Sequence, residues 1–200
     1  MANTIQCPSC GAPTELRSRS IRLVVCAYCS STIELTPTGL VENGKAAQLA
    51  DLFTELATGA AGRIGSKSFA VAGRVRYTWS DGFWDEWSIA LDDGTMAWLH
   101  EDEGELSMVA EVPVQGSIDF DSARVGEHML INGERAYVHE RRSAEIQGAE
   151  GQVPRGVFPG ATLDYIDATV GKVHYMLERT QEGIELFVGE PVDDDAVEVY

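Results

Sequence analysis

Two Cys-x2-Cys pairs near the start of the chain constrain its fold more than any other feature. They are Cys7-Pro-Ser-Cys10 and Cys26-Ala-Tyr-Cys29, and fifteen residues separate them. Each pair forms a tight knuckle that presents two thiolates, and two knuckles at this separation close a tetrahedron around Zn²⁺. Because four cysteine ligands leave no position for an activated water, we expect one structural zinc ion held by Cys7, Cys10, Cys26 and Cys29. Two disulfides, or an iron-loaded or labile site, are the alternatives.

The charge of the chain is strongly acidic and unevenly distributed. Its 200 residues include 32 Asp and Glu against 15 Lys and Arg, a net charge of −17, although residues 1–40 carry three arginines and two glutamates. Lys and Arg are the side chains that neutralise phosphates, so the main body is unsuited to nucleic acid or anionic lipid. We expect a protein partner with a basic face, or a cationic ligand. The plain alternative is that the acidity only maintains solubility.

The N-terminal segment gives the expected location. Its first residues, MANTIQCPSCG, contain neither the basic segment nor the apolar core of a signal peptide. No stretch of the sequence approaches the ~20 apolar residues that span a bilayer. We therefore expect a cytoplasmic protein without a transmembrane segment or direct membrane contact, in a compartment where thiols stay reduced.

The chain divides into a zinc ribbon at 1–36, a helical linker at 37–62 and a β-rich domain at 63–200. In the linker, Asn43 is a candidate helix N-cap. Apolar residues follow it at helical spacing: Ala46, Leu49, Leu52, Phe53 and Leu56.

From residue 63 onward, short alternating segments are separated by turn-forming pairs. Asp93-Gly94 and Asn132-Gly133 are typical of type I′ hairpin turns, in which both central residues take positive φ. We expect a mainly β fold, an antiparallel barrel or sandwich of about nine or ten short strands, with the ribbon and one short helix before it. The β-rich domain contains two halves, 63–112 and 124–190, joined through 113–123.

Several segments resemble a known family. Gly73-Arg-Val-Arg-Tyr77, Trp84-Asp-Glu-Trp87 and Asp92-Asp-Gly94 are similar to domain of unknown function 4178, and the opening Cys7-Pro-Ser-Cys-Gly-Ala-Pro13 matches the ribbon that often precedes it. The resemblance implies a bacterial protein of a family with no established activity and no assigned catalytic residues. It also implies links with membrane-stress proteins of the phage-shock type and with polyamine aminopropyltransferases.

A cluster of tryptophans is the main candidate for a binding site. The functional interpretation is a pocket formed by Trp84, Trp87 and Trp98, with Asp85 and Glu86 at its rim, suited to an amine or a basic side chain through cation–π contact.

The alternative for this cluster is core packing. In a strand, Trp84 and Trp87 point to opposite faces unless a bulge intervenes. Glu86 would then pair with Arg74 or Arg76 across the sheet.

Nothing in the sequence indicates catalysis. The four cysteines are assigned to metal, and the four histidines are scattered without H-x3-H or HExxH spacing. We expect a non-catalytic, zinc-ribbon-headed β-module that acts as a protein-interaction adaptor, in bacterial envelope or membrane stress. The alternative is a binder of, or an enzyme acting on, a cationic small molecule such as a polyamine.

Overall fold

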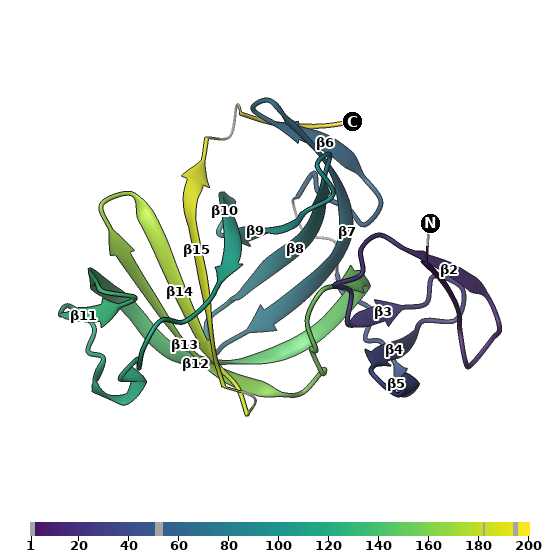
Figure 1. Ribbon diagram of the computed structural model, residues 1–200, viewed down its shortest axis with the longest axis horizontal. Helices are drawn as coiled ribbons and strands as arrows, with labels where there is room; N and C mark the ends of the chain where they lie inside the picture. Colours follow the sequence, from purple (N-terminus) through teal and green to yellow (C-terminus); the bar gives the residue numbers. More distant parts are fainter. Residues whose placement is uncertain (1–2, 51–53, 182, 194–195) are drawn as a thin grey trace.

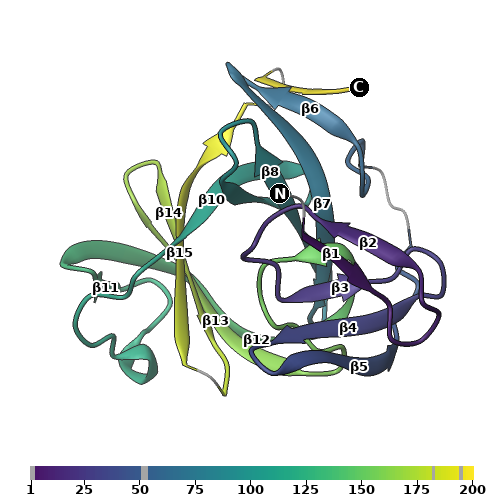
Figure 2. The ribbon, with the colours of Figure 1, turned by 45° about the vertical axis from the view of Figure 1, so that its right-hand side comes forward.

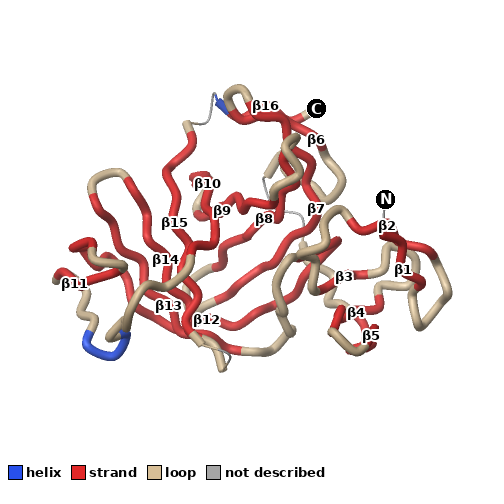
Figure 3. The backbone as a smooth tube through the Cα atoms, in the orientation of Figure 1, coloured by secondary structure: helices blue, strands red, loops and turns tan. Residues whose placement is uncertain are grey.

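Strands account for most of the backbone in the computed structural model, which describes residues 3–50, 54–181, 183–193 and 196–200 (Figure 3). A 3-10 turn, η1, spans Phe120–Ser122. The strands are β1 (Asn3–Gln6), β2 (Pro13–Leu16), β3 (Leu23–Val25), β4 (Ser31–Thr36), β5 (Gly39–Lys45), β6 (Ala61–Ile64), β7 (Lys67–Thr78), β8 (Phe83–Leu91), β9 (Met96–Asp102), β10 (Glu105–Val112), β11 (His128–Ile131), β12 (Glu134–Val153), β13 (Thr162–Val170), β14 (Val173–Arg179), β15 (Ile184–Val192) and β16 (Val197–Val199).

Antiparallel pairing closes eight of these strands into a barrel. β7, β8, β9, β10, β15, β14, β13 and β12 follow one another in the sheet, and β12 also pairs with β7, so the order returns to its start (Figures 1 and 2). The closing ladder joins Ile146 to Tyr77 and Glu150 to Arg74. The prediction of a mainly antiparallel β fold is confirmed, and the closing ladder distinguishes a barrel from a two-layer sandwich.

Two stretches of the chain supply four barrel strands each. β7 to β10 come from residues 67–112, and β12 to β15 come from residues 134–192. The two sets meet twice, where β10 pairs with β15 and where β7 pairs with β12. The connection between them contains η1 and β11. β11 pairs antiparallel with the start of β12.

β12 holds the architecture together. It runs for 20 residues and pairs first with β11, then with β13, next with β7, and finally with β3 of the ribbon. Register shifts between Val138 and Glu140 and between Ile146 and Gly148 mark bulges, which let so long a strand bend around the barrel. The backbones of β7 and β12 approach so closely that a Cβ at Gly73 would lie 2.5 Å from the Gln152 carbonyl oxygen.

Buried apolar residues form clusters on both surfaces of the closed sheet. One cluster fills the interior and includes Val75, Tyr77 and Trp98. Another covers the outer face of β7, β8 and β9, where Leu56 packs with Phe69. Since both faces of these strands are covered, their burial is nearly continuous rather than alternating.

The linker differs from the helix predicted over it. Asn43 lies in β5, which pairs with β4, and described residues 46–50 and 54–60 are irregular; predicted positions 51–53 lie outside the described residues. Leu49 and Leu56 are buried, as their apolar character requires. They pack against the barrel from irregular backbone, so the apolar spacing of these two residues indicated burial and not a helix. The described part of the chain also contains no helix long and apolar enough to cross a bilayer.

Candidate functional site

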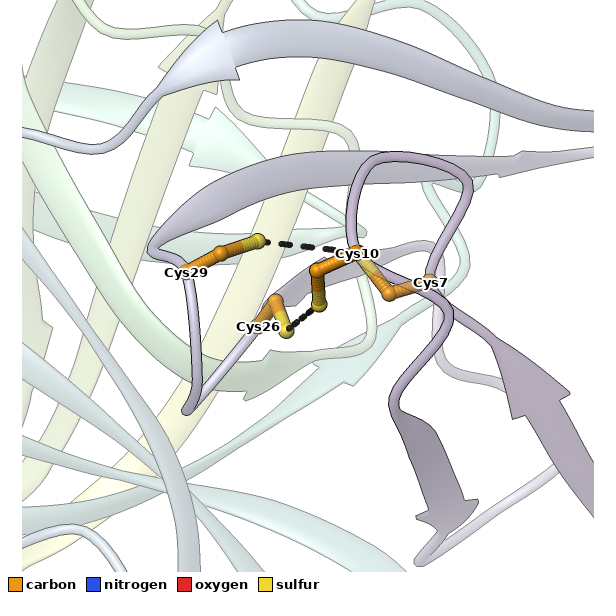
Figure 4. Close-up of side chains that lie close together, drawn as sticks. All are labelled: Cys7, Cys10, Cys26 and Cys29. Carbon is orange, nitrogen blue, oxygen red and sulfur yellow. Dashed lines mark hydrogen bonds between the residues drawn. The ribbon is translucent and has the colours of Figure 1, made fainter.

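The four cysteines lie together at the tips of two knuckles. Cys7 and Cys10 lie between β1 and β2, and Cys26 and Cys29 between β3 and β4 (Figure 4). All four Sγ atoms lie within 4.8 Å of one another, with Cys7 3.7 Å from Cys29 and Cys10 3.7 Å from Cys26. A tetrahedron with metal–sulfur bonds of about 2.3 Å has sulfur–sulfur separations of about 3.8 Å. The cluster therefore fits a four-coordinate metal ion.

Backbone and neighbouring side chains support this arrangement. Gly11 N donates to Cys7 O at 2.8 Å, and Ser30 N donates to Cys26 O at 2.8 Å, so both knuckles close in the same way. The hydroxyl and the backbone N–H of Ser31 lower the pKa of Cys29 to about 6, which favours its thiolate. The ammonium of Lys45 donates to the Cys29 carbonyl and adds a positive charge beside the sulfurs.

The four-cysteine ribbon is joined to the barrel by backbone pairing and by one side chain. The end of β12 pairs with β3 through Gln152 and Val153. The Gln152 side chain accepts a hydrogen bond from Arg17 N and donates one to Glu15 O, each at 2.8 Å. Leu23 of the ribbon is fully buried in the interior cluster of the barrel.

The tryptophan cluster predicted as one pocket is divided between the two faces of the sheet. Trp84 and Trp98 belong to the interior cluster, and Glu86 faces the same way, because it contacts Tyr77 and Trp84. Trp87 belongs to the outer cluster, and Asp85 faces outward with it.

The outward-facing residues form a closed, buried ion-pair network. Asp85 accepts hydrogen bonds from Arg76 Nε at 2.7 Å and Nη2 at 2.5 Å. The guanidinium of Arg74 lies 4.9 Å from the ring centre of Trp87 and pairs with Glu150 at 2.9 Å. The arginines thus pair with Asp85 and Glu150, not with Glu86 as the core-packing alternative has it. The register explains this, because Glu86 lies opposite Val75 and points inward with it.

Inside the barrel, Arg155 neutralises a first layer of carboxylates. It comes from the β12–β13 connection, is 9% exposed, and its Nη2 lies 2.5 Å from both Glu178 and Glu185. Its Nη1 lies 3.4 Å from Glu86, and its guanidinium lies 5.1 Å from the ring centre of Phe187.

A second acidic layer surrounds a small cavity next to the first. The cavity has a volume of about 20 Å³. Its described lining consists of Trp79, Trp84, His100, Asp102, Glu140, Tyr165, Asp167, Met176, Leu177 and Glu178. Trp84 packs against Tyr165 with ring centres 5.0 Å apart and against Trp79 at 5.4 Å. The small cavity, called the inner cavity below, is therefore walled by aromatic rings and carboxyl groups.

The inner cavity adjoins a wide hollow at the mouth of the barrel. His100, Asp102, Asp167 and Met176 line both, and the outer hollow has a volume of about 620 Å³. The β9–β10 turn and the β13–β14 turn border the hollow, since Glu103 and Gly171 line it.

Like charges perturb the carboxyl groups of the inner cavity. Burial, and next the charge of Glu140, raises the pKa of Asp167 to about 7. Burial also raises the pKa of Asp102 to about 6 and lowers that of His100 to about 4, so the imidazole is neutral near pH 7. Each shift disfavours charge and is due first to burial; for Asp167 and Asp102 the neighbouring acids add to it.

The described lining residues of the inner cavity and the outer hollow include neither lysine nor arginine. Arg142 pairs with Glu140 at 2.7 Å, but it is not a lining residue and its side chain is 47% exposed. Asp102 Oδ1 and Glu178 Oε1 are buried without a hydrogen-bond partner among the described residues. Two buried carboxylate oxygens are thus left for a donor from outside the described chain.

The sequence prediction named only Trp84 among the residues of the inner cavity. The sequence does contain a signal for the other residues, which the prediction did not use. Polar residues recur at every second position in two strands: His100 and Asp102 in β9, and Tyr165 and Asp167 in β13. Residues at every second position of a strand share one face. Asp102 therefore faces the interior of the barrel together with Trp98. The approach of Arg155 from a loop had no local signal.

A closed antiparallel barrel with a four-cysteine ribbon attached to its longest strand defines a two-part β-module. The chain belongs to the family described as Domain of unknown function (DUF4178), whose model matches residues 57–194. This confirms the resemblance in the sequence; the match covers the barrel and not the ribbon. No curated protein and no solved structure matches the chain.

Proposed function

We propose that the barrel is a binding module for a small cationic ligand, and that a primary ammonium group of this ligand enters the inner cavity. Of the two functions that the sequence predicts, the geometry favours the cationic small molecule over the adaptor. The observation that carries the proposal is the second acidic layer, where Asp102 and Asp167 face a cavity whose described lining offers no lysine or arginine.

The layer of carboxylates around Arg155 supports this proposal, because it already holds a cation inside the same barrel. There, Glu86, Glu178 and Glu185 surround the guanidinium of Arg155, which also lies over the ring of Phe187. Carboxylates plus an aromatic face are thus already used in this barrel to hold a cation. The inner cavity repeats the same chemistry with Trp84 and Tyr165 as the rings, but without the internal cation.

The size of the cavity selects the cationic group. A cavity of about 20 Å³ accommodates roughly one water-sized group, which matches an ammonium head and is too small for a guanidinium. The outer hollow, at about 620 Å³, has room for the rest of a small molecule. Cation–π contact with Trp84 and Tyr165 would add to the charge attraction.

We propose binding without a chemical reaction. Among the described residues of the inner cavity there is no serine, threonine, cysteine or lysine to act as a nucleophile. His100, with a pKa near 4, is a poor proton acceptor at neutral pH. The raised pKa of Asp167 is accounted for by burial among other acids, and a bound ammonium would lower it again.

We propose further that the metal of the ribbon is zinc. Cys7, Cys10, Cys26 and Cys29 would hold it, and four thiolates in a tetrahedron are the usual ligand set of structural zinc. The ion would stabilise the ribbon and supply no reaction. Because the site needs reduced thiols, the proposal includes a cytoplasmic location. Elemental analysis of reduced protein should return about one zinc per chain, and protein that folds fully without metal would contradict this.

The adaptor function is kept as a second proposal because of β5. This strand ends the sheet order on the ribbon side, and all its residues are exposed, including Leu40 and Val41. An exposed edge strand can accept a strand from a protein partner, which the acidic net charge suggests has a basic face. A photo-crosslinking residue at position 41 should trap such a partner in cells, while the same residue at exposed position 134 should not.

Calorimetric titration with n-pentylamine tests the cation-binding proposal. Wild-type protein should release heat and change its tryptophan fluorescence, because Trp79 and Trp84 line the cavity. Asp167→Asn should weaken binding by about tenfold or more, through loss of one carboxylate at the ammonium position. Glu134→Gln removes the same charge from an exposed strand end and should leave the affinity unchanged. Absence of heat and of a fluorescence change in the wild type would overturn the proposal.

A further inference from the structure

The route from the inner cavity to solvent has a defined length and lining. Along β14, Glu178 lines the inner cavity, Met176 lines both spaces, and His174 lines the outer hollow. Four residues of extended strand cover about 13 Å. A ligand whose ammonium group occupies the inner cavity must therefore extend along Met176 toward the mouth, which requires a linear, partly apolar body.

A buried oxygen indicates that the inner end of this route receives a donor. The side chain of Glu178 is 2% exposed, and its Oε1 has no hydrogen-bond partner among the described residues. Its Oε2 is already bound by Arg155. An unsatisfied carboxylate oxygen in a buried position costs free energy, which an incoming ammonium group would recover.

The outer end of the route is acidic as well. Glu105 lies directly opposite Asp102 across the β9–β10 ladder, and Glu103 follows in the turn between them. Both glutamates line the outer hollow. Directly opposed residues of an antiparallel pair have Cβ atoms about 5 Å apart, so Glu105 continues the acidic surface from Asp102 toward solvent.

Burial disfavours the charged form of two histidines that line the hollow, His174 and His100. Burial is the main reason that the pKa of His174 is lowered, with His139 adding to the effect. His100 is neutral for the same reason. His139 is engaged with Thr169, 2.7 Å from its Nε2. The described lining of the hollow thus presents carboxylates without a lysine or arginine to receive an anion.

We infer that the ligand is a linear diamine without an acidic group, with one ammonium in the inner cavity and the other near Glu105 and Glu103. This inference rests on the proposed function and specifies its ligand. An amino acid would bring a carboxylate against Asp102 and Glu105, where like charges repel. A monoamine would use only the inner end of the route.

Three matched probes test the inference: n-pentylamine, 1,5-diaminopentane and L-lysine, which is the same diamine with an added carboxylate. By calorimetry, the diamine should bind at least about tenfold more tightly than the monoamine, and L-lysine should bind at least about a hundredfold more weakly than the diamine. Equal affinities for the two amines, or L-lysine binding as tightly as the diamine, would overturn the inference while leaving the proposed function intact. Failure of both amines to bind would overturn both.

A pair of variants tests the outer position. Glu105→Gln should lower the affinity for 1,5-diaminopentane about tenfold and so reduce the difference between the diamine and the monoamine. Glu134→Gln, which removes an exposed charge elsewhere, should leave that difference as it is in the wild type. If Glu105→Gln leaves the ratio of the two affinities unchanged, the second ammonium does not lie at Glu105 and the inference is wrong.

Discussion

Arg155 and Glu178 meet inside the closed sheet, where Arg155 Nη2 donates a hydrogen bond to Glu178 Oε2 across 2.5 Å. The two side chains are 9% and 2% exposed. Arg155 is the cation that allows Glu178, Glu86 and Glu185 to face one another in the barrel interior.

Replacement of this internal cation should be strongly destabilising. Arg155→Met keeps the volume and the apolar stem but leaves three carboxyl groups without their partner, so we expect the free energy of unfolding to fall by about 3–5 kcal/mol. Chemical denaturation measures this. The matched change is Arg63→Met, which breaks an exposed ion pair with Glu198 and should cost less than about 1 kcal/mol. Similar losses in the two variants would show that the interior network contributes little.

Stability should fall as the pH rises from about 5 to 8. The pKa of Asp167 is raised to about 7 and that of Asp102 to about 6, from an ordinary value of 3.8. Between the ordinary and the raised pKa the folded protein binds more protons than the unfolded chain, so folding is favoured at the acidic side of this window. The lowered pKa of His100, about 4 against an ordinary 6.5, acts in the opposite direction between these values, but the two carboxyl groups outweigh it. The midpoint of thermal unfolding, measured across this pH range, should therefore decrease toward pH 8.

The Asp167→Asn variant checks the origin of that slope. Without the carboxyl, the dependence of the midpoint on pH should flatten, and the variant should gain stability relative to wild type at pH 8. Glu134→Gln should keep the wild-type slope. Asp164 and Asp121 have lowered pKa values, through Ser143 and Arg179 for the first and Arg179 for the second, so they act only at lower pH and in the opposite direction. A wild-type midpoint that rises toward pH 8 would contradict the assignment.

Barrel closure should depend on Gly73, which lies where β7 pairs with β12. In Gly73→Ala the new Cβ would lie 2.5 Å from Gln152 O and 2.6 Å from Glu150 O, so one backbone must move. We expect a loss of about 3 kcal/mol, the upper part of the usual cost of overpacking. Gly156→Ala is the control, because its nearest neighbour would lie at 3.9 Å. Equal stability of the two variants would mean that the close backbone approach is not maintained in solution.

Removal of the metal should unfold the ribbon first. Metal binding free energy is folding free energy in so small a unit, so a zinc chelator should abolish the hydrogen-exchange protection of β3 and β4. Cys10→Ser should act in the same direction, whereas Ser9→Ala, in the same knuckle, should leave protection unchanged. Full protection of these strands in chelator-treated protein would show that the ribbon folds without an ion.

Much of the barrel was predictable because its signals are local. Asp93-Gly94 and Asn132-Gly133 both lie in hairpin turns: Asn132 and Gly133 both take positive φ, as a type I′ turn requires, whereas at Asp93-Gly94 only the glycine does, so that turn is of another type. The spacing of Trp84 and Trp87 predicted opposite faces, and they do pack in different clusters. Cysteine spacing likewise located the ribbon, because the ligands of each knuckle lie within one turn.

The parts that could not be predicted depend on contacts between distant segments. Leu49 and Leu56 show helical spacing, yet both are buried against the barrel from irregular backbone. The length of β12 was hidden by its bulges, which interrupt the alternation that marks a strand. No local pattern could indicate that Arg155 enters the interior, since Glu178 and Glu185 become its partners only after closure.

The burial of Leu23 in the interior of the barrel determines how far the chain can be truncated. The family match begins at residue 57, but Leu23 of the ribbon is buried in the interior cluster of the barrel. Residues 57–194 expressed alone would therefore lack Leu23. Val153 and Val157, which belong to the same cluster, would become more exposed. Such a fragment would self-associate through this newly exposed apolar surface. Measurements of ligand binding by the barrel should therefore use protein that retains the four-cysteine ribbon.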